Sequence, residues 1–115
     1  MGELACGEEG LGEGWSAPLI VAGSFIERVR GFLAPRPPGC VLMIVPCSSI
    51  HTFGMGNDLD VAFVGIDGRV LYSERSVRPG RVVRVRHAQA VLERRSSDDG
   101  PWYRVGERIM TFIEG

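Results

Sequence analysis

The sequence predicts a mainly β fold, a small antiparallel β-sandwich or barrel with one principal short α-helix near residues 25–33. Three observations support this prediction. The 115 residues include 16 glycines and 7 prolines, which favours many short elements joined by turns. Short apolar runs rich in β-branched residues recur along the chain. Two of these runs are separated by Asp67-Gly68, the strongest short-range hairpin signal in the sequence.

The helix is expected where Ser24 and Glu27 have the spacing of a capping box, in which each side chain satisfies a free backbone amide. Apolar residues from Phe25 to Leu33 fall on one stripe at helical spacing, and Pro35 ends the pattern. Strands are expected in the other apolar runs, at residues 18–23, 40–45, 59–66, 69–74, 81–86, 89–94 and 108–113.

The chain is expected to form one domain over residues 18–115, preceded by a flexible Gly/Glu-rich tail over residues 1–17. A length of 115 residues is typical of a single domain. In the first 17 residues the apolar side chains are scattered among Gly and Glu. Such a segment buries too little surface to offset the entropy lost on ordering.

Overall composition narrows the classes of partner. The net charge of −1 gives no bulk attraction for nucleic acid or for a membrane surface. The three cysteines are odd in number, which argues against a disulfide framework and for a reducing compartment. Neither a signal peptide nor a membrane-spanning run is recognisable, so we expect a soluble, cytoplasmic protein.

The segment from residue 51 to residue 60 is the candidate for a ligand-binding cleft. If the backbone is extended there, His51, Phe53 and Met55 share one face and Thr52 takes the other. An imidazole beside Phe and Met side chains could form one wall of a cleft. The alternative interpretation is a core histidine that donates to a backbone carbonyl. The candidate ligand-binding residues are therefore His51, Thr52, Phe53, Met55 and Asp60.

Asp60 is unusual because it begins an apolar strand, on the face shared by Ala62, Val64 and Ile66. Burying a carboxylate costs several kcal/mol unless it is paired or hydrogen-bonded. In the structural interpretation Asp60 accepts backbone amides from the preceding loop and fixes the register of the strand. In the functional interpretation it is a general base or a ligand group in a pocket.

Several segments carry a family resemblance. They are Arg28-x-x-Gly31-Phe32-Leu33, Val45-Pro46-Cys47-x-Ser49-Ile50-His51-Thr52-Phe53-Gly54-Met55 and Leu59-Asp60-Val61-Ala62-Phe63. With them, residues 20–112 resemble the DUF192 (UPF0127) family, in particular the branch with an "IHTFGM" segment. Gly56-Asn57-Asp58 and Arg94–Asp99 depart from the pattern of the family. The resemblance implies a mainly-β, jelly-roll-like sandwich, and it implies no settled function.

Three functional hypotheses follow. The leading one is a non-catalytic ligand-binding or accessory domain, because the segment 51–60 joins polar residues to an apolar wall without a full catalytic set. The second is a small hydrolase with Cys47 as nucleophile, His51 as base and Asp60 as orienting group, although no Gly-x-Ser-x-Gly motif is present. The third is an adaptor whose basic strand, Arg81–Arg86, binds an acidic partner; nucleic acid is less expected because Tyr72 alone lies close enough in sequence to stack on bases.

No metal or cofactor is expected. Cys40, Cys47 and His51 could together offer three zinc ligands. Six residues separate the two cysteines, however, whereas zinc knuckles place two to four residues between them. Cys40 is expected to pack as a small apolar side chain, as free cysteines usually do.

Overall fold

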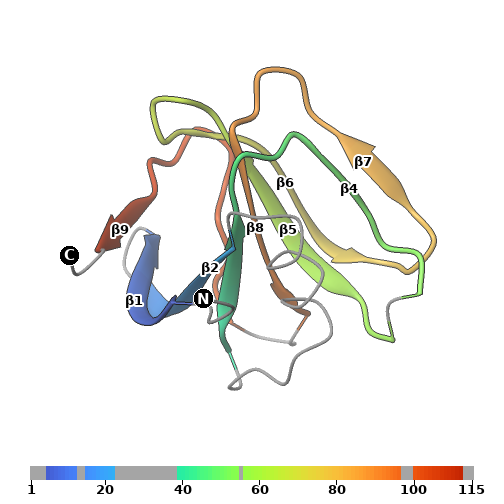
Figure 1. Cartoon of the computed structure of the whole chain (residues 1–115), viewed down its shortest axis with the longest axis horizontal. Coiled ribbons are helices and arrows are strands. Elements are labelled where there is room, and N and C mark those ends of the chain that lie inside the picture. The colour runs from blue at the N-terminus through green and yellow to red at the C-terminus, as the bar shows by residue number, and fades with distance from the viewer. Residues whose placement is uncertain (1–4, 13–14, 23–38, 55, 97–99, 113–115) are drawn as a thin grey trace.

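The computed structural model of the chain describes residues 5–12, 15–22, 39–54, 56–96 and 100–112 (Figure 1). These residues form strands and turns and contain no helix, so the mainly-β prediction is confirmed. The helix predicted near residues 25–33 lies outside the described residues. The strands are β1 (Ala5–Gly12), β2 (Trp15–Ala22), β3 (Val41–Ile44), β4 (Ser49–His51), β5 (Leu59–Val64), β6 (Val70–Val77), β7 (Val82–Arg84), β8 (Ala90–Arg95) and β9 (Met110–Phe112).

Seven strands form one sheet in the order β6-β5-β8-β3-β2-β1-β9, and β4 and β7 form a separate two-stranded ribbon. Most neighbours are antiparallel, as predicted. The exception is the pair β2 and β3, which run parallel with Leu19 opposite Val41 and Ala22 opposite Ile44. A parallel pair needs a connection of about a dozen residues or more, which residues 23–40 provide.

The N-terminal segment differs from the flexible tail expected over residues 1–17. Ala5–Gly12 forms β1, and β2 begins at Trp15. β1 pairs with β2 on one side and with β9 on the other, where Gly10 lies opposite Thr111. Strand pairing uses the N–H and C=O groups of the main chain, which Gly and Glu carry as other residues do. The composition of this segment therefore did not reveal its place in the sheet.

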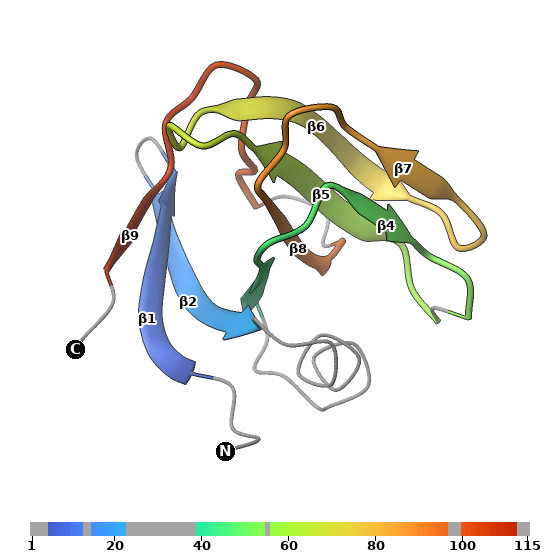
Figure 2. The same cartoon turned by 45° about the horizontal axis from the view of Figure 1, so that its top comes forward.

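The large sheet is strongly curved, so that β1 and β2 stand at an angle to β5, β6 and β8 (Figure 2). Its concave side holds an apolar cluster made of Leu19, Val41, Ala62, Val64, Val70, Ala90, Leu92, Trp102 and Tyr103. The β4–β7 ribbon covers the opposite face of β5. There the buried residues are Ile50, Leu59, Val61, Phe63, Val77, Val83, Ala88 and Val91.

All six residues of β5 are buried, because both of its faces are covered. Successive side chains of a strand point to opposite faces. Leu59, Val61 and Phe63 therefore point toward the ribbon. Asp60 is placed on the concave side together with Ala62 and Val64. This alternation decides which of the candidate site residues can meet.

The hairpin predicted at Asp67-Gly68 is confirmed, since β5 and β6 pair antiparallel on either side of it. The amide of Gly65 donates to the carbonyl of Arg69 at 2.9 Å, and the amide of Gly68 donates to the carbonyl of Gly65 at 3.0 Å. Gly68 has a φ of +84°, which glycine adopts without the strain that a side chain would bring. The Oδ1 atom of Asp67 accepts a hydrogen bond from the amide of Arg69.

Within the described part of the chain there is no helix with the length and apolar character that a membrane crossing requires.

A polar cluster joins β6 to the residue that precedes β7. The carboxylate of Glu74 accepts hydrogen bonds from the Tyr72 hydroxyl at 2.5 Å and from Arg81 Nη1 at 2.8 Å. The hydrogen bond from Arg81, followed by that from Tyr72, lowers the pKa of Glu74 below the usual 4.5. Because the carboxylate form is favoured by folding, its contribution to stability is present above pH 4.5 and is lost as the pH falls through the folded pKa.

We expect Glu74→Gln to reduce the dependence of stability on acid pH. The pair is largely exposed to solvent, so the effect should be about 0.5 kcal/mol. Urea unfolding of both proteins at pH 6 and pH 3 measures it: the wild type should lose about that much more stability between the two pH values than the variant. Equal losses in the two proteins would contradict a folded-state contribution from this carboxylate.

Candidate functional site

The residues predicted to form a cleft are divided between different environments. His51 is exposed on β4, and its ring centroid lies 5.7 Å from that of Phe53, whose side chain is 59% exposed. Thr52 is completely buried, and its hydroxyl donates to the carbonyl of Arg78 at 2.8 Å and accepts from the amide of Arg81 at 2.8 Å. Thr52 thus closes the turn that leads into β7. Met55 lies outside the described residues.

Asp60 lies on the other side of β5 from the ribbon. Ile50, the neighbour of His51, packs with Leu59 and Val61. Because side chains alternate along β5, Asp60 points to the opposite, concave side. The structure therefore brings His51 and Phe53 together on the surface of the ribbon, and it does not bring Asp60 to them.

The carboxylate of Asp60 is completely buried and fully engaged. Oδ1 accepts from the amide of Ser76 at 3.0 Å and from the hydroxyl of Ser96 at 2.9 Å. Oδ2 accepts from Nε of Arg94 at 3.0 Å, and Nη2 of Arg75 lies 3.7 Å from it. These partners support the structural interpretation of Asp60, although its backbone donor lies on β6 and not in the preceding loop.

An irregularity in β6 presents that backbone donor. The register between β5 and β6 shifts between Leu59 and Val61, so two residues of β6, Arg75 and Ser76, lie opposite the single residue Asp60. Ser76 has a φ of +58°, which is uncommon for a residue with a side chain. Bulges of this kind redirect backbone groups and side chains. Here the bulge directs the amide of Ser76 at the buried carboxylate.

Arg94 connects the buried carboxylate to a group of aromatic side chains. It lies directly opposite Asp60 on the neighbouring strand β8 and is 5% exposed. Its guanidinium carbon lies 4.6 Å from the ring centroid of Trp102 and 5.9 Å from that of Trp15. The Nη2 atom also donates to the carbonyl of Gly100 at 3.2 Å. Arg94 therefore holds the segment after residue 100 against the sheet.

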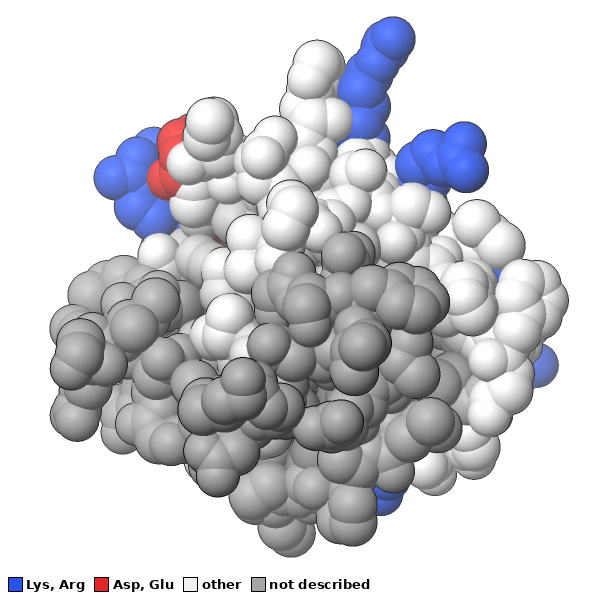
Figure 3. Space-filling model, in the orientation of Figure 1, with Lys and Arg blue, Asp and Glu red and all other residues white. Residues whose placement is uncertain are grey.

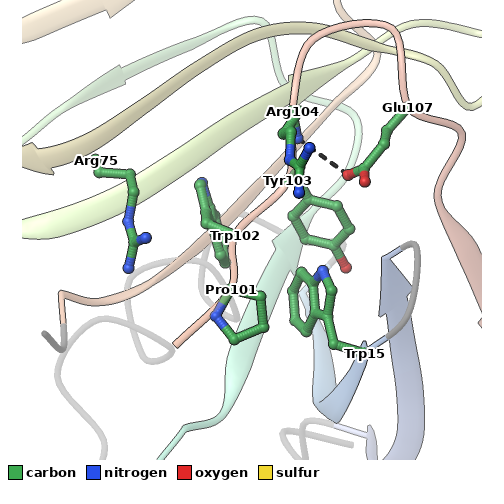
Figure 4. A pocket seen from close by; sticks show the side chains of 7 residues that line it. All are labelled: Trp15, Arg75, Pro101, Trp102, Tyr103, Arg104 and Glu107. Carbon is green, nitrogen blue, oxygen red and sulfur yellow. Dashed lines mark hydrogen bonds between the residues drawn. The ribbon is translucent and has the colours of Figure 1, made fainter. Parts of the chain in front are cut away.

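A pocket of about 300 Å³ opens beside these aromatic rings (Figure 4). The indole of Trp102 is fixed by a hydrogen bond of 3.0 Å from Nε1 to the carbonyl of Val61. The ring of Tyr103 lies 5.0 Å from that of Trp102, nearly edge-on, and 4.8 Å from that of Trp15. The lining residues are Trp15, Arg75, Pro101, Trp102, Tyr103, Arg104 and Glu107.

The hydroxyl of Tyr103 is the most unusual polar group of this pocket. Tyr103 is 2% exposed, and its hydroxyl has no hydrogen-bond partner among the described residues. Burial, followed by the negative charge of Glu107, raises the pKa of Tyr103 far above its ordinary value of 10. The hydroxyl therefore stays protonated, and it is a donor enclosed by protein atoms. Glu107 itself accepts from the amide of Arg104 at 3.0 Å, as the dashed line in Figure 4 shows.

The three residues of the hydrolase hypothesis are not assembled. Cys47 is half-buried, and its thiol donates to the carbonyl of Ser49 at 3.1 Å. No contact among the described residues joins Cys47 to His51, and Asp60 lies on the far side of β5. The described residues also contain no group of three His, Cys, Asp or Glu side chains that could hold a metal ion.

The arginines of the predicted basic strand have different surroundings. Arg81 forms an ion pair with Glu74, with Nη1 and Oε2 2.8 Å apart. Arg84 and Arg86 are exposed, whereas Val83, which lies opposite Ile50 of β4, is buried. The basic side chains therefore lie on the surface of the ribbon.

Sequence reasoning missed the residues that build the pocket: Trp15, Arg94, Trp102, Tyr103 and Glu107. One signal was present. Asp60 and Arg94 have opposite charges, and each lies within a largely apolar run of the sequence. Which runs become neighbouring strands depends on the topology of the sheet, however, and a single sequence does not give it.

Comparisons with known proteins show the fold. No family model matches the chain, and no curated protein is significantly similar to it in sequence. A crystal structure of a protein of unknown function from Novosphingobium aromaticivorans DSM 12444 is similar with a TM-score of 0.69, over 93% of this chain and 84% of that one. A protein of Sinorhizobium meliloti 1021, described as a "putative transcription regulator", is similar with a TM-score of 0.71, over 95% of this chain and 97% of that one.

Both similar proteins share 15% sequence identity with the chain. At that level the likeness shows the fold alone. The chain is thus a small mainly-β domain with the fold of these two proteins. The regulatory role in the description of the Sinorhizobium protein is therefore not assigned to this chain.

Proposed function

We propose that this protein is a cytoplasmic, non-catalytic binding domain that takes a small, planar and largely apolar molecule in the pocket beside Tyr103. The observation that carries this proposal is the buried hydroxyl of Tyr103. A buried donor left without a partner costs about 1–3 kcal/mol. A ligand that displaces the side chains around this hydroxyl and places a hydrogen-bond acceptor against it would recover that free energy on binding.

The walls of the pocket support the same assignment. Small-molecule sites are concave, mostly apolar and contain few polar groups, and their volumes begin near 300 Å³. The rings of Trp15 and Trp102 form part of the wall of this pocket, beside polar groups. Asp60 binds Arg94, and the guanidinium of Arg94 packs on the ring of Trp102. The role we propose for Asp60 is therefore to position the wall of the pocket rather than to touch the ligand.

The resemblance to the DUF192 family leads to a related proposal, that the chain is a divergent member of that family. The mainly-β fold is the kind that the resemblance implies. The segment from residue 45 to residue 54 forms β4 and its flanking turns, and residues 59–63 lie in the buried strand β5. If the proposal is right, an experimental structure of a protein with the full motif should have a strand in register with β5 and a three-residue ribbon strand in place of β4.

Tyr103→Phe separates binding from stability. The change removes the hydroxyl and keeps the ring, so we expect the free energy of unfolding to stay the same or to rise by about 1 kcal/mol. Ligand-observed NMR with a set of planar aromatic amides and ketones should first identify compounds that bind the wild type. Their dissociation constants should increase about tenfold in the variant, which corresponds to the loss of one hydrogen bond of about 1.4 kcal/mol.

Tyr72→Phe is the matched control, because Tyr72 and Tyr103 are the two tyrosines of the chain and the hydroxyl of Tyr72 binds Glu74 outside the pocket. It should leave the dissociation constants unchanged. Compounds that bind the two variants equally well would show that the Tyr103 hydroxyl is not part of the site. A complete absence of binding to the wild type would argue against the proposed function itself.

A further inference from the structure

The outer face of the β4–β7 ribbon presents exposed apolar side chains. Ile50 and Val83 lie opposite each other and are buried against the large sheet. Their neighbours alternate to the outside, where His51 pairs with Val82 and Ser49 pairs with Arg84. Val82 is 57% exposed, and Phe53 beside His51 is 59% exposed. Val82 and Phe53 are therefore apolar side chains that this part of the molecule leaves open to solvent.

The same ribbon carries an excess of positive charge. Residues 45–54 and 78–89 contain four arginines and two histidines, and they contain no Asp or Glu. Arg81 is paired with Glu74, whereas no ion pair joins Arg78, Arg84 or Arg86 to another residue that the structure describes. Figure 3 shows arginines projecting from the upper right of the molecule, over the ribbon, with no acidic side chain visible beside them. The net charge of the whole chain is −1, so this concentration of arginine makes the ribbon a locally positive surface.

The backbone of β7 has an open edge next to these side chains. The amide of Thr52 donates to the carbonyl of Arg81, and the amide of Val85 donates to the carbonyl of Ser48. In an antiparallel pair the hydrogen-bonded positions alternate, so the N–H and C=O groups of Val82 and Arg84 point away from β4. Among the described residues, β7 pairs with β4 alone. Such an edge is a template on which another chain can add a strand.

We propose that the β7 edge binds an extended acidic segment of a partner protein as an additional strand of the ribbon. In strand addition, main-chain hydrogen bonds supply affinity and alternate side chains supply specificity. Carboxylates of the partner would meet Arg84 and Arg86, and apolar side chains would lie against Val82 and Phe53. This surface is separate from the pocket beside Tyr103, so the inference does not depend on the proposed function.

The observations favour a peptide over a nucleic acid. Single-stranded nucleic acid binds to aromatic platforms that accept successive bases. The ribbon offers the one ring pair His51–Phe53, and those two rings are already in contact with each other. A nucleic acid also has no backbone amides to pair with the free C=O groups of β7. An acidic peptide uses the arginines, the exposed apolar side chains and the open edge together.

Fluorescence anisotropy tests the proposal with a labelled Asp-Leu peptide in which Leu, Asp and Asp occupy three alternate positions, so that all three share the strand face that would lie beside Val82, Arg84 and Arg86. We expect saturable binding by the wild type, weaker at high salt because the arginines are exposed. Arg84→Glu should weaken binding about tenfold or more, and Val82→Ser should weaken it with the charge unchanged. Arg108→Glu is the matched control, since Arg108 is exposed outside the ribbon and should leave binding unchanged. All these positions are exposed, so the thermal melts of the variants should agree with that of the wild type.

Two further arms identify the mode and the class of partner. A peptide of the same sequence with alternate amides methylated cannot form the ladder, and we expect it not to bind. Equal binding of the methylated peptide would overturn strand addition. If an oligo-dT binds the wild type as tightly as the peptide does, and binds Arg84→Glu more weakly, the choice of a peptide would be overturned. If the Asp-Leu peptide does not bind the wild type, the proposal would be overturned altogether. Tyr103→Phe should bind the peptide normally, which separates this site from the pocket.

Discussion

Asp60→Ala is expected to lower the free energy of unfolding by about 3–5 kcal/mol, because it leaves the buried guanidinium of Arg94 without its counter-charge. The carboxylate also accepts hydrogen bonds from the amide of Ser76 and the hydroxyl of Ser96, and both donors would lose this acceptor. Urea unfolding monitored by tryptophan fluorescence measures the loss. Asp60→Asn should cost less, since an amide oxygen can still accept from Ser76.

The double variant Asp60→Ala/Arg94→Met distinguishes the worth of the ion pair from the cost of breaking it. Replacing both buried charges by apolar groups is often far less damaging than removing one of them. We therefore expect the double variant to be more stable than either single variant. Asp67→Ala, in the exposed turn after β5, is the control for loss of a carboxylate and should cost less than about 1 kcal/mol. A neutral Asp60→Ala would show that the buried network contributes nothing to stability.

Trp102→Ala is expected to lower the free energy of unfolding by about 3–5 kcal/mol, as large-to-small changes of buried aromatic residues do. The indole fills the concave side of the sheet, lies under the guanidinium of Arg94 and donates to the carbonyl of Val61. Trp102→Phe keeps a ring over Arg94 and removes the donor, so its cost should be nearer 1–2 kcal/mol. Equilibrium unfolding of the two variants in parallel measures both effects.

These two variants also report on the pocket, because Trp102 forms one of its walls. A compound that binds the wild type there should bind Trp102→Ala much more weakly under conditions in which the variant is folded. Trp15→Ala is a useful comparison, since Trp15 is less deeply buried and should cost less stability. If Trp102→Ala unfolds as readily as Trp102→Phe, the packing of the indole is not what holds the segment after residue 100.

Much of the fold could be predicted from local sequence. The apolar runs that became β3, β5 and β8 are bounded by turn residues, and the Asp67-Gly68 turn sits between two paired strands as predicted. The face of β5 on which Asp60 lies was also predicted in part, since Ala62 and Val64 lie on the same, concave side of the strand. Ile66 does not, because it lies in the turn and is 89% exposed.

The candidate site was predicted less well, for a reason that follows from strand geometry. The sequence distance from His51 to Asp60 is short, but β4 belongs to the ribbon and Asp60 points to the far face of β5. A period of two decides which face a side chain takes, and proximity in sequence does not. The pocket itself combines β2, β6 and the segment after residue 100, so it depends on strand order in the sheet. β1 was missed because its pairing relies on backbone groups, which composition does not describe.

The pairing of β1 with β9 has a consequence for how the protein is made. These are the first and the last of the strands that the structure describes, and they lie side by side in the sheet (Figure 1). During synthesis the edge of β1 stays open until every other strand has left the ribosome. A domain built from such distant pairings folds in milliseconds to seconds, slowly compared with a helical bundle of similar size. The nascent chain therefore presents an unpaired strand edge for most of its translation.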